Sequence, residues 1–87
     1  MTERSAAGYL VEQYLPRATA AAAEPWVAAL AASGAPVRCR GSILVPDDDL
    51  CLHLLTAASL EAAVRAVELC GITPERAIEA TAWWPSR

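Results

Sequence analysis

The sequence predicts a single α+β domain in which a four-stranded antiparallel sheet carries two helices on one face. Two stretches have the spacing of apolar residues that is typical of helices, and four shorter segments are rich in β-favouring residues. Their order is strand, helix, strand, strand, helix, strand. Two such halves with right-handed crossovers form a ferredoxin-like βαββαβ sandwich. A chain of 87 residues buries only about 60% of its unfolded surface, so a second subunit would add stability.

The first half of the predicted domain runs from a tyrosine- and leucine-rich strand into an alanine-rich helix. The strand covers residues 8–15 and stops at a proline, and the helix covers residues 18–33. Two helix starts fit the sequence. Either Thr19 is the N-cap and Pro25 lies past the first turn, or Glu24 is the cap and Pro25 is the first helical residue.

The second half continues with a strand over residues 36–46, in which apolar and polar residues alternate, and an apolar run over residues 50–55. Ser59 is the expected N-cap of a helix over residues 60–70. The last strand is expected over residues 77–83. We therefore divide the chain into a flexible N-terminus (1–7), one domain (8–83) and a C-terminal tail (84–87).

Charge and composition exclude several classes of function. The net charge is −3, the pI is near 4.9, lysine is absent and the seven arginines are scattered, so a nucleic-acid-binding surface is not expected. No apolar run approaches the roughly 20 residues of a bilayer span, and the first residues do not resemble a secretion signal. We expect a cytoplasmic protein that does not bind membranes. Its three cysteines have no CxxC spacing, which indicates reduced thiols.

In the predicted topology both helices cover one face of the sheet and leave the other face open. Alternation along the strands assigns the following residues to the uncovered face: Leu10, Glu12, Tyr14, Arg38, Arg40, Ser42, Cys51, His53, Leu55, Glu79, Thr81 and Trp83. Ionisable and aromatic groups mixed with leucine are typical of a pocket lining. The first strand is the least certain part of this assignment, because a shift by one residue exchanges Glu12 for Tyr9 and Gln13.

His53, the only histidine, is the main candidate for chemistry on this face. Imidazole titrates near neutrality and suits general acid–base catalysis, and Glu12 on the neighbouring strand lies within cross-strand reach to orient it. Tyr14 is the candidate hydrogen-bond donor. The alternative is a histidine that is simply hydrogen-bonded in a dimer interface.

Further residues of the same face are candidates for substrate binding. Arg38 and Arg40 can hold a ligand carboxylate or pair with Glu12 and Glu79, or they can merely keep an edge strand soluble. Trp83 is the candidate lid of the pocket.

The segment "VPDDD", residues 45–49, is interpreted as the turn between the second and third strands, because aspartate favours turns through local hydrogen bonds. Its spacing does not match a calcium loop. A transition-metal site would combine His53, Glu12 and Cys51 with these aspartates. Phosphate-binding, flavin and nicotinamide motifs are absent from the sequence, so no cofactor and no metal is predicted, with nickel as the alternative.

Three segments, "YLVEQYLP", "RGSILVPDDDLCLHLLTAASLEAAVRA" and "CGITPERAIEA", together resemble a small actinobacterial domain-of-unknown-function family that includes a nickel-binding ferredoxin-like protein. The resemblance covers residues 8–82 and implies a ferredoxin-like fold and a face-to-face homodimer of the dimeric α+β barrel type. The expected function is that of a homodimer that binds a small organic molecule on the open sheet face. Catalysis of a cofactor-independent cyclisation or isomerisation is compatible with it. The alternatives are a nickel-binding protein and a purely structural or partner-binding dimer.

Overall fold

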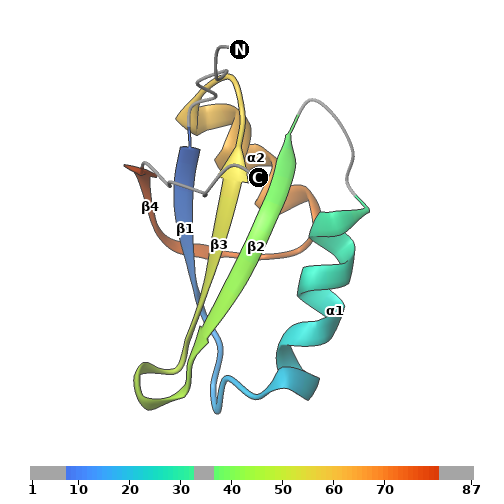
Figure 1. Ribbon diagram of the computed structural model, residues 1–87, viewed down its shortest axis with the longest axis vertical. Helices are drawn as coiled ribbons and strands as arrows, with labels where there is room; N and C mark the ends of the chain where they lie inside the picture. The colour runs from blue at the N-terminus through green and yellow to red at the C-terminus, as the bar shows by residue number, and fades with distance from the viewer. Residues whose placement is uncertain (1–7, 33–36, 81–87) are drawn as a thin grey trace, which may run out of the picture.

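The computed structural model describes residues 8–32 and 37–80 of the chain. Along the chain lie β1 (Gly8–Tyr14), α1 (Ala20–Ala31), β2 (Arg38–Val45), the short 3-10 helix η1 (Pro46–Asp48), β3 (Leu50–Thr56), α2 (Leu60–Leu69) and β4 (Pro74–Ala80). The four strands form one antiparallel sheet in the order β2-β3-β1-β4, with β3 and β1 in the centre (Figure 1). The predicted ferredoxin-like βαββαβ fold is confirmed.

Both helices pack on the same face of the sheet. The larger core cluster joins Leu30 of α1 and Val67 of α2 to Tyr9, Val11 and Leu55 of the central strands. Of these side chains, Val11, Leu30, Leu55 and Val67 are almost completely buried, because the two helices cover this face of the sheet. The opposite face therefore carries no helix of the described chain.

Helix α1 begins at Ala20, and its N-cap is Thr19, whose hydroxyl accepts a hydrogen bond from the backbone of Ala22 at 3.1 Å. Pro25 lies inside the helix, so the start at Glu24 was wrong. Pro25 has no N–H to donate to the carbonyl of Ala21, which belongs to an exposed residue.

Strand β4 begins at Pro74, three residues before its predicted start. Proline is compatible with the first position of an edge strand because no ladder hydrogen bond from its nitrogen is needed there. The predicted end of this strand, with Thr81 and Trp83, lies outside the described residues.

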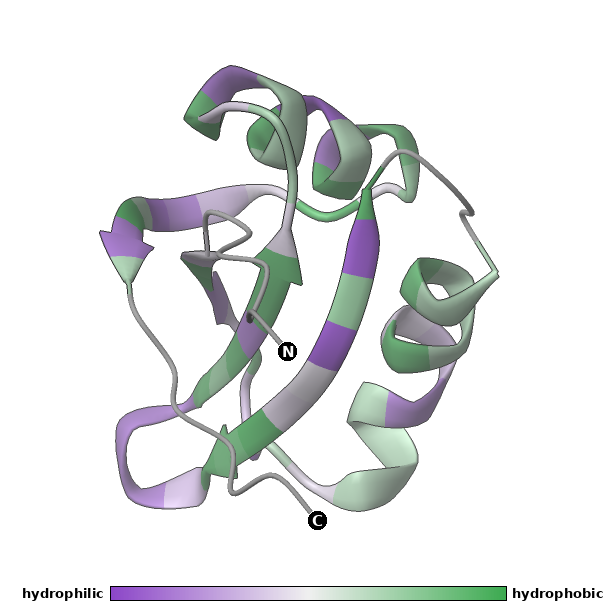
Figure 2. Ribbon diagram, turned by 45° about the horizontal axis from the view of Figure 1, so that its top comes forward, coloured by the Kyte–Doolittle hydropathy of each residue, from purple (hydrophilic) through white to green (hydrophobic). Residues whose placement is uncertain are grey.

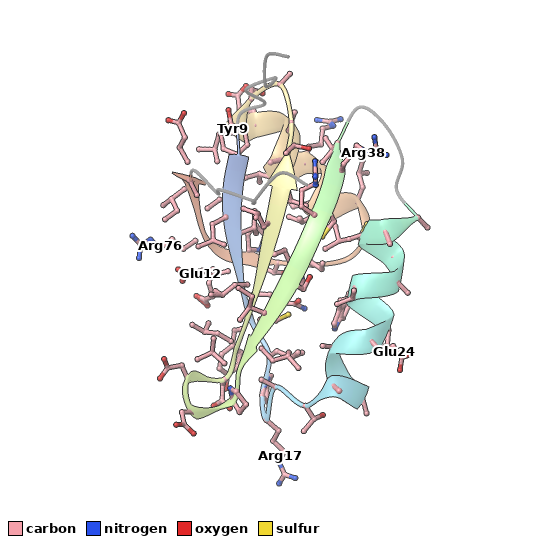
Figure 3. All side chains as sticks on the ribbon, in the orientation of Figure 1. Tyr9, Glu12, Arg17, Glu24, Arg38 and Arg76 are labelled. Atoms are coloured by element: carbon pink, nitrogen blue, oxygen red, sulfur yellow. The ribbon has the colours of Figure 1, made fainter. Side chains whose placement is uncertain are left out.

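The acidic turn between β2 and β3 is built as predicted from aspartate chemistry. Pro46–Asp48 form one 3-10 turn, and Asp49 follows in the left-handed conformation with φ 54°. The Asp49 carboxylate accepts a hydrogen bond from the backbone of Arg17 at 2.9 Å, and its carbonyl accepts one from Leu15 at 2.7 Å. The turn thus anchors the connection between β1 and α1. The hydrophilic turn stands out in Figure 2, and Arg17 lies below it in Figure 3.

Gly8 is required by a close approach of β4. A β-carbon at this position would lie 2.6 Å from the backbone oxygen of Ala80, which is paired with Gly8. We expect Gly8→Ala to destabilise the fold by about 1–3 kcal/mol through overpacking, measured by urea denaturation. Gly41→Ala is the matched control, because a β-carbon there meets no atom within 4 Å. Equal stability of both variants would contradict this account.

Candidate functional site

His53 lies beneath the helices and not on the uncovered face. It is 0% exposed, as is Cys51, and both lie on the same face of β3 as the helix-covered Leu55. Glu12 lies on the other face, where it is paired with Leu52. The predicted common face of His53 and Glu12 was therefore wrong, and the assignments of Cys51 and Leu55 were wrong with it.

The physical reason lies in the strand register. In an antiparallel pair, residues directly opposite one another point to the same side, so Glu12 and Leu52 must share a face. If that face were buried, the Glu12 carboxylate would be desolvated beneath the helices. Burying the neutral side chains of Gln13 and His53 instead is less costly, because they satisfy each other by a hydrogen bond.

Strand β2 changes phase at a β-bulge between Cys39 and Gly41. Before the bulge, Arg38 pairs with Thr56 and lies on the uncovered face, as predicted. After it, Ser42 pairs with His53 and lies on the helix-covered face, so the prediction for Ser42 was wrong. Arg40 is the extra residue of the bulge and is exposed.

Strand β4 also differs from the prediction. Glu79 pairs with Tyr9, a residue of the helix-side core, so Glu79 belongs to that side and not to the uncovered face. It lies at the β4 edge, whereas Arg38 lies at the β2 edge, so the proposed pairing of these two charges is not formed. Arg76 pairs with Glu12 on the uncovered face instead.

Three polar side chains form a hydrogen-bonded chain across β2, β3 and β1 beneath the helices. The hydroxyl of Ser42 lies 2.8 Å from Nδ1 of His53, and Nε2 of His53 lies 2.8 Å from Oε1 of Gln13. We call Ser42, His53 and Gln13 the polar chain. The sequence prediction placed Ser42 and His53 together but on the uncovered face, and it left Gln13 on the other face. The one available signal was Gly41, since a glycine inside a strand indicates a bulge.

The polar chain fixes the tautomer of His53. The amide oxygen of Gln13 only accepts hydrogen bonds, so Nε2 of the imidazole must carry the proton. Nδ1 then accepts, and the hydroxyl of Ser42 donates its hydrogen to it. Burial lowers the pKa of His53. The imidazole is therefore neutral at neutral pH, with a lone pair directed at the serine hydroxyl.

This burial predicts a loss of stability in mild acid. The folded protein has a lower pKa at His53 than the unfolded chain, so the stabilisation is present above the unfolded pKa of about 6.5 and is lost as the pH falls toward the folded value. One proton limits the slope to about 1.4 kcal/mol per pH unit. Urea denaturation at pH 7.5, 6.5 and 5.5 measures it.

Because His53 is the only histidine, His53→Gln is expected to flatten this pH dependence. A wild-type stability that stays constant from pH 7.5 to 5.5 would show that the imidazole is not held neutral by burial.

The uncovered side of the sheet is rich in leucine. Its members follow from the strand pairing and from their absence from the core clusters, and we call them the open face: Leu10, Glu12, Tyr14, Arg38, Gly41, Ile43, Val45, Leu50, Leu52, Leu54, Thr56, Arg76, Ile78 and Ala80. Tyr14 is 56% exposed and Ile43 is 59% exposed. Apolar side chains that gather on one uncovered side of a sheet are a candidate interaction site.

Two charges of the open face, Arg38 and Arg76, lie on its edge strands β2 and β4, and the third, Glu12, lies on the central strand β1. Arg76 and Glu12 form a loose ion pair with 3.9 Å between Nη1 and Oε2, and the Arg76 side chain is 62% exposed. Figure 3 shows this pair on the β4 side and Arg38 at the far end of β2. Such an exposed pair contributes little to folding, and its donors remain accessible.

Two further features concern metals and membranes. Within residues 8–32 and 37–80, no three His, Cys, Asp or Glu side chains are grouped so that they could hold a metal ion. Cys39, Cys51 and Cys70 are free thiols. Helices α1 and α2 both fall short of the length and hydrophobicity of a membrane-spanning helix.

Comparison of the chain with protein-family models, with curated proteins and with solved structures finds no match. The class of the protein therefore follows from its topology alone, and it is that of the ferredoxin-like α+β domains. Its function has to be argued from the open face and the polar chain.

Proposed function

We propose that the protein is a homodimer in which two copies pack by their open faces and hold a small apolar organic molecule in the layer between them. The observation that carries the proposal is the row of leucines on the central strand β3, Leu50, Leu52 and Leu54, which no described helix covers. A second copy would remove these side chains from water, and a two-fold axis requires only that the surface be complementary to itself.

The size of the open face supports a reversible dimer. Strands of seven or eight residues that rise about 3.3 Å per residue and lie about 4.8 Å apart make a face of about 19 Å by 23 Å. Two flat faces of this size would bury about 900 Å² in total, and side chains that project from the faces add to this area. That area exceeds most lattice contacts, at about 800 Å², but falls below the standard interface of about 1,200–2,000 Å². We expect dissociation in the micromolar range.

The polar groups of the open face favour a ligand that is apolar over most of its surface. Glu12 and Tyr14 on β1 lie beside the leucines of β3, and Arg76 lies on β4. They supply an acceptor, a hydroxyl and a cation. The proposal contains no acid–base role for His53 on this face, because both of its ring nitrogens are occupied on the other side of the sheet. Tyr14 and Glu12 are proposed to orient the ligand.

Sedimentation velocity from about 1 to 200 µM tests the dimer. We expect a shift from monomer to dimer as the concentration rises, and a fluorescent naphthalene sulfonate probe that brightens in the dimer. A dimer that leaves the probe dark would be a structural dimer without a ligand layer. A monomer at every concentration would overturn the proposal and leave the open face to a different occupant.

A further inference from the structure

The polar chain places a serine hydroxyl against a base of fixed tautomer. Ser42 donates its hydrogen to Nδ1 of His53 across 2.8 Å, and Gln13 holds the opposite ring nitrogen in its protonated form. A serine becomes nucleophilic when its hydroxyl donates to a neutral imidazole, because the imidazole takes the hydroxyl proton as the oxygen attacks. The open face plays no part in this arrangement.

The members of the polar chain differ in their access to solvent. His53 is 0% exposed and Gln13 is 5% exposed, whereas Ser42 is partly exposed on the edge strand β2. Ser42 is thus the least buried residue of the polar chain, and it lies at the edge of the sheet, where a small reagent would approach. The base behind it is shielded, as a general base should be in order to avoid competition from water.

From these contacts we propose that Ser42 is a nucleophile, with His53 as its general base, and that it accepts acyl or phosphonyl groups from small activated esters. Oγ of Ser42 forms a bond to the carbonyl carbon while its proton passes to Nδ1 of His53. The bond to the leaving alkoxide then breaks, and the alkoxide takes that proton from Nδ1. A water molecule repeats the sequence on the acyl-serine, releasing the acid and restoring the hydroxyl.

A second serine provides an internal comparison. Ser59 is exposed, and its hydroxyl caps helix α2 by accepting a hydrogen bond from the backbone of Ala62 at 3.1 Å. It has no hydrogen bond to an imidazole, because the only one in the chain belongs to His53, whose two ring nitrogens are occupied by the polar chain. Ser59 is more exposed than Ser42, so a reagent that selects serines by access alone would modify Ser59 first.

The test is reaction with a fluorophosphonate, followed by intact mass and peptide mapping. We expect a single adduct at Ser42, with fluoride as the leaving group, and none in Ser42→Ala. Ser59→Ala is expected to react as the wild type does.

A variant without the base has to remain folded, so His53→Leu is combined with Gln13→Leu, which removes the more deeply buried partner of the imidazole, while the part-buried hydroxyl of Ser42 keeps Sγ of Cys39 at 3.9 Å. Circular dichroism checks its fold. We expect its reaction at Ser42 to be at least about 100-fold slower, the usual contribution of a general base. An adduct at Ser59, no adduct at all, or an equal rate at Ser42 in this variant would overturn the proposal and make the polar chain purely structural.

Discussion

Replacement of His53 by alanine is expected to remove most of the stability of the fold. The imidazole is fully buried, so its loss leaves a cavity, and it also leaves the hydroxyl of Ser42 and the amide of Gln13 without their partners. Cavity and unpaired polar groups together should cost about 3–4 kcal/mol. A domain of this size has about 5 kcal/mol in total, so His53→Ala should be partly unfolded at 37 °C. Urea denaturation followed by circular dichroism measures the difference.

The matched control replaces the whole polar chain by apolar side chains, as His53→Leu, Gln13→Leu and Ser42→Ala together. Removing every partner at once avoids unpaired buried groups, so this triple variant should lie within about 1.5 kcal/mol of the wild type although it carries more substitutions. The expected order of stability is therefore triple variant above single variant. If His53→Ala loses less than about 1 kcal/mol, the imidazole is not the buried centre of the network.

The architecture was predictable because several independent local signals agree on it. Thr19 and Ser59 cap the two helices, and their hydroxyls accept the expected backbone hydrogen bonds. Pro46 and the aspartates that follow it mark the turn between two strands. Each signal depends on neighbouring residues only. The order of elements then leaves few ways to form a sheet.

The placement of the site was not predictable in the same way, because it depends on pairing between distant strands. In "LCLHLL" both faces of the strand are apolar, so alternation does not decide which one is buried. The buried face of β3 is determined by its pairing with β1, because Glu12 is paired with Leu52 and must stay near water. The bulge in β2 then brings Ser42 to His53. A prediction that weighed the burial of Glu12 against that of His53 would have chosen the correct face.

The resemblance to a nickel-binding family stays a prediction, as does a cytoplasmic location. The observed assignment of residues to the two faces differs from the predicted one, and this changes which chemical groups each side of the sheet carries. The open face keeps its leucines with Glu12, Tyr14 and Arg76, and the helix-covered face keeps the imidazole. The proposed binding and the proposed nucleophilic chemistry thereby lie on opposite sides of the sheet, and each can be tested by substitutions that leave the other side unchanged.

Substitution of Leu52 by arginine is expected to abolish the dimer while the monomer stays folded. Leu52 lies on the central strand β3 and is flanked on the open face by Glu12 and Ile43. Its side chain is partly exposed and belongs to neither core cluster, so we expect the monomer to fold with a longer, charged side chain at this position. In a face-to-face dimer the two-fold axis would bring the new cations into one apolar layer. We expect the affinity of the dimer to fall at least about 100-fold, measured by sedimentation velocity.

The control for this variant is Leu69→Arg. Leu69 is 79% exposed and lies on α2, on the side of the sheet opposite the open face, so the same change of charge and size should leave the dimer intact. Comparing the two variants separates a specific effect on the interface from a general effect of net charge, since both add one positive charge to the chain. If both dissociate, charge governs the association, and if neither does, the two copies do not meet through the leucines of β3. Only dissociation of Leu52→Arg alone, with its melting curve unchanged, assigns the dimer to the open face, because Leu52 lies in the proposed interface and Leu69 lies on the opposite side of the sheet.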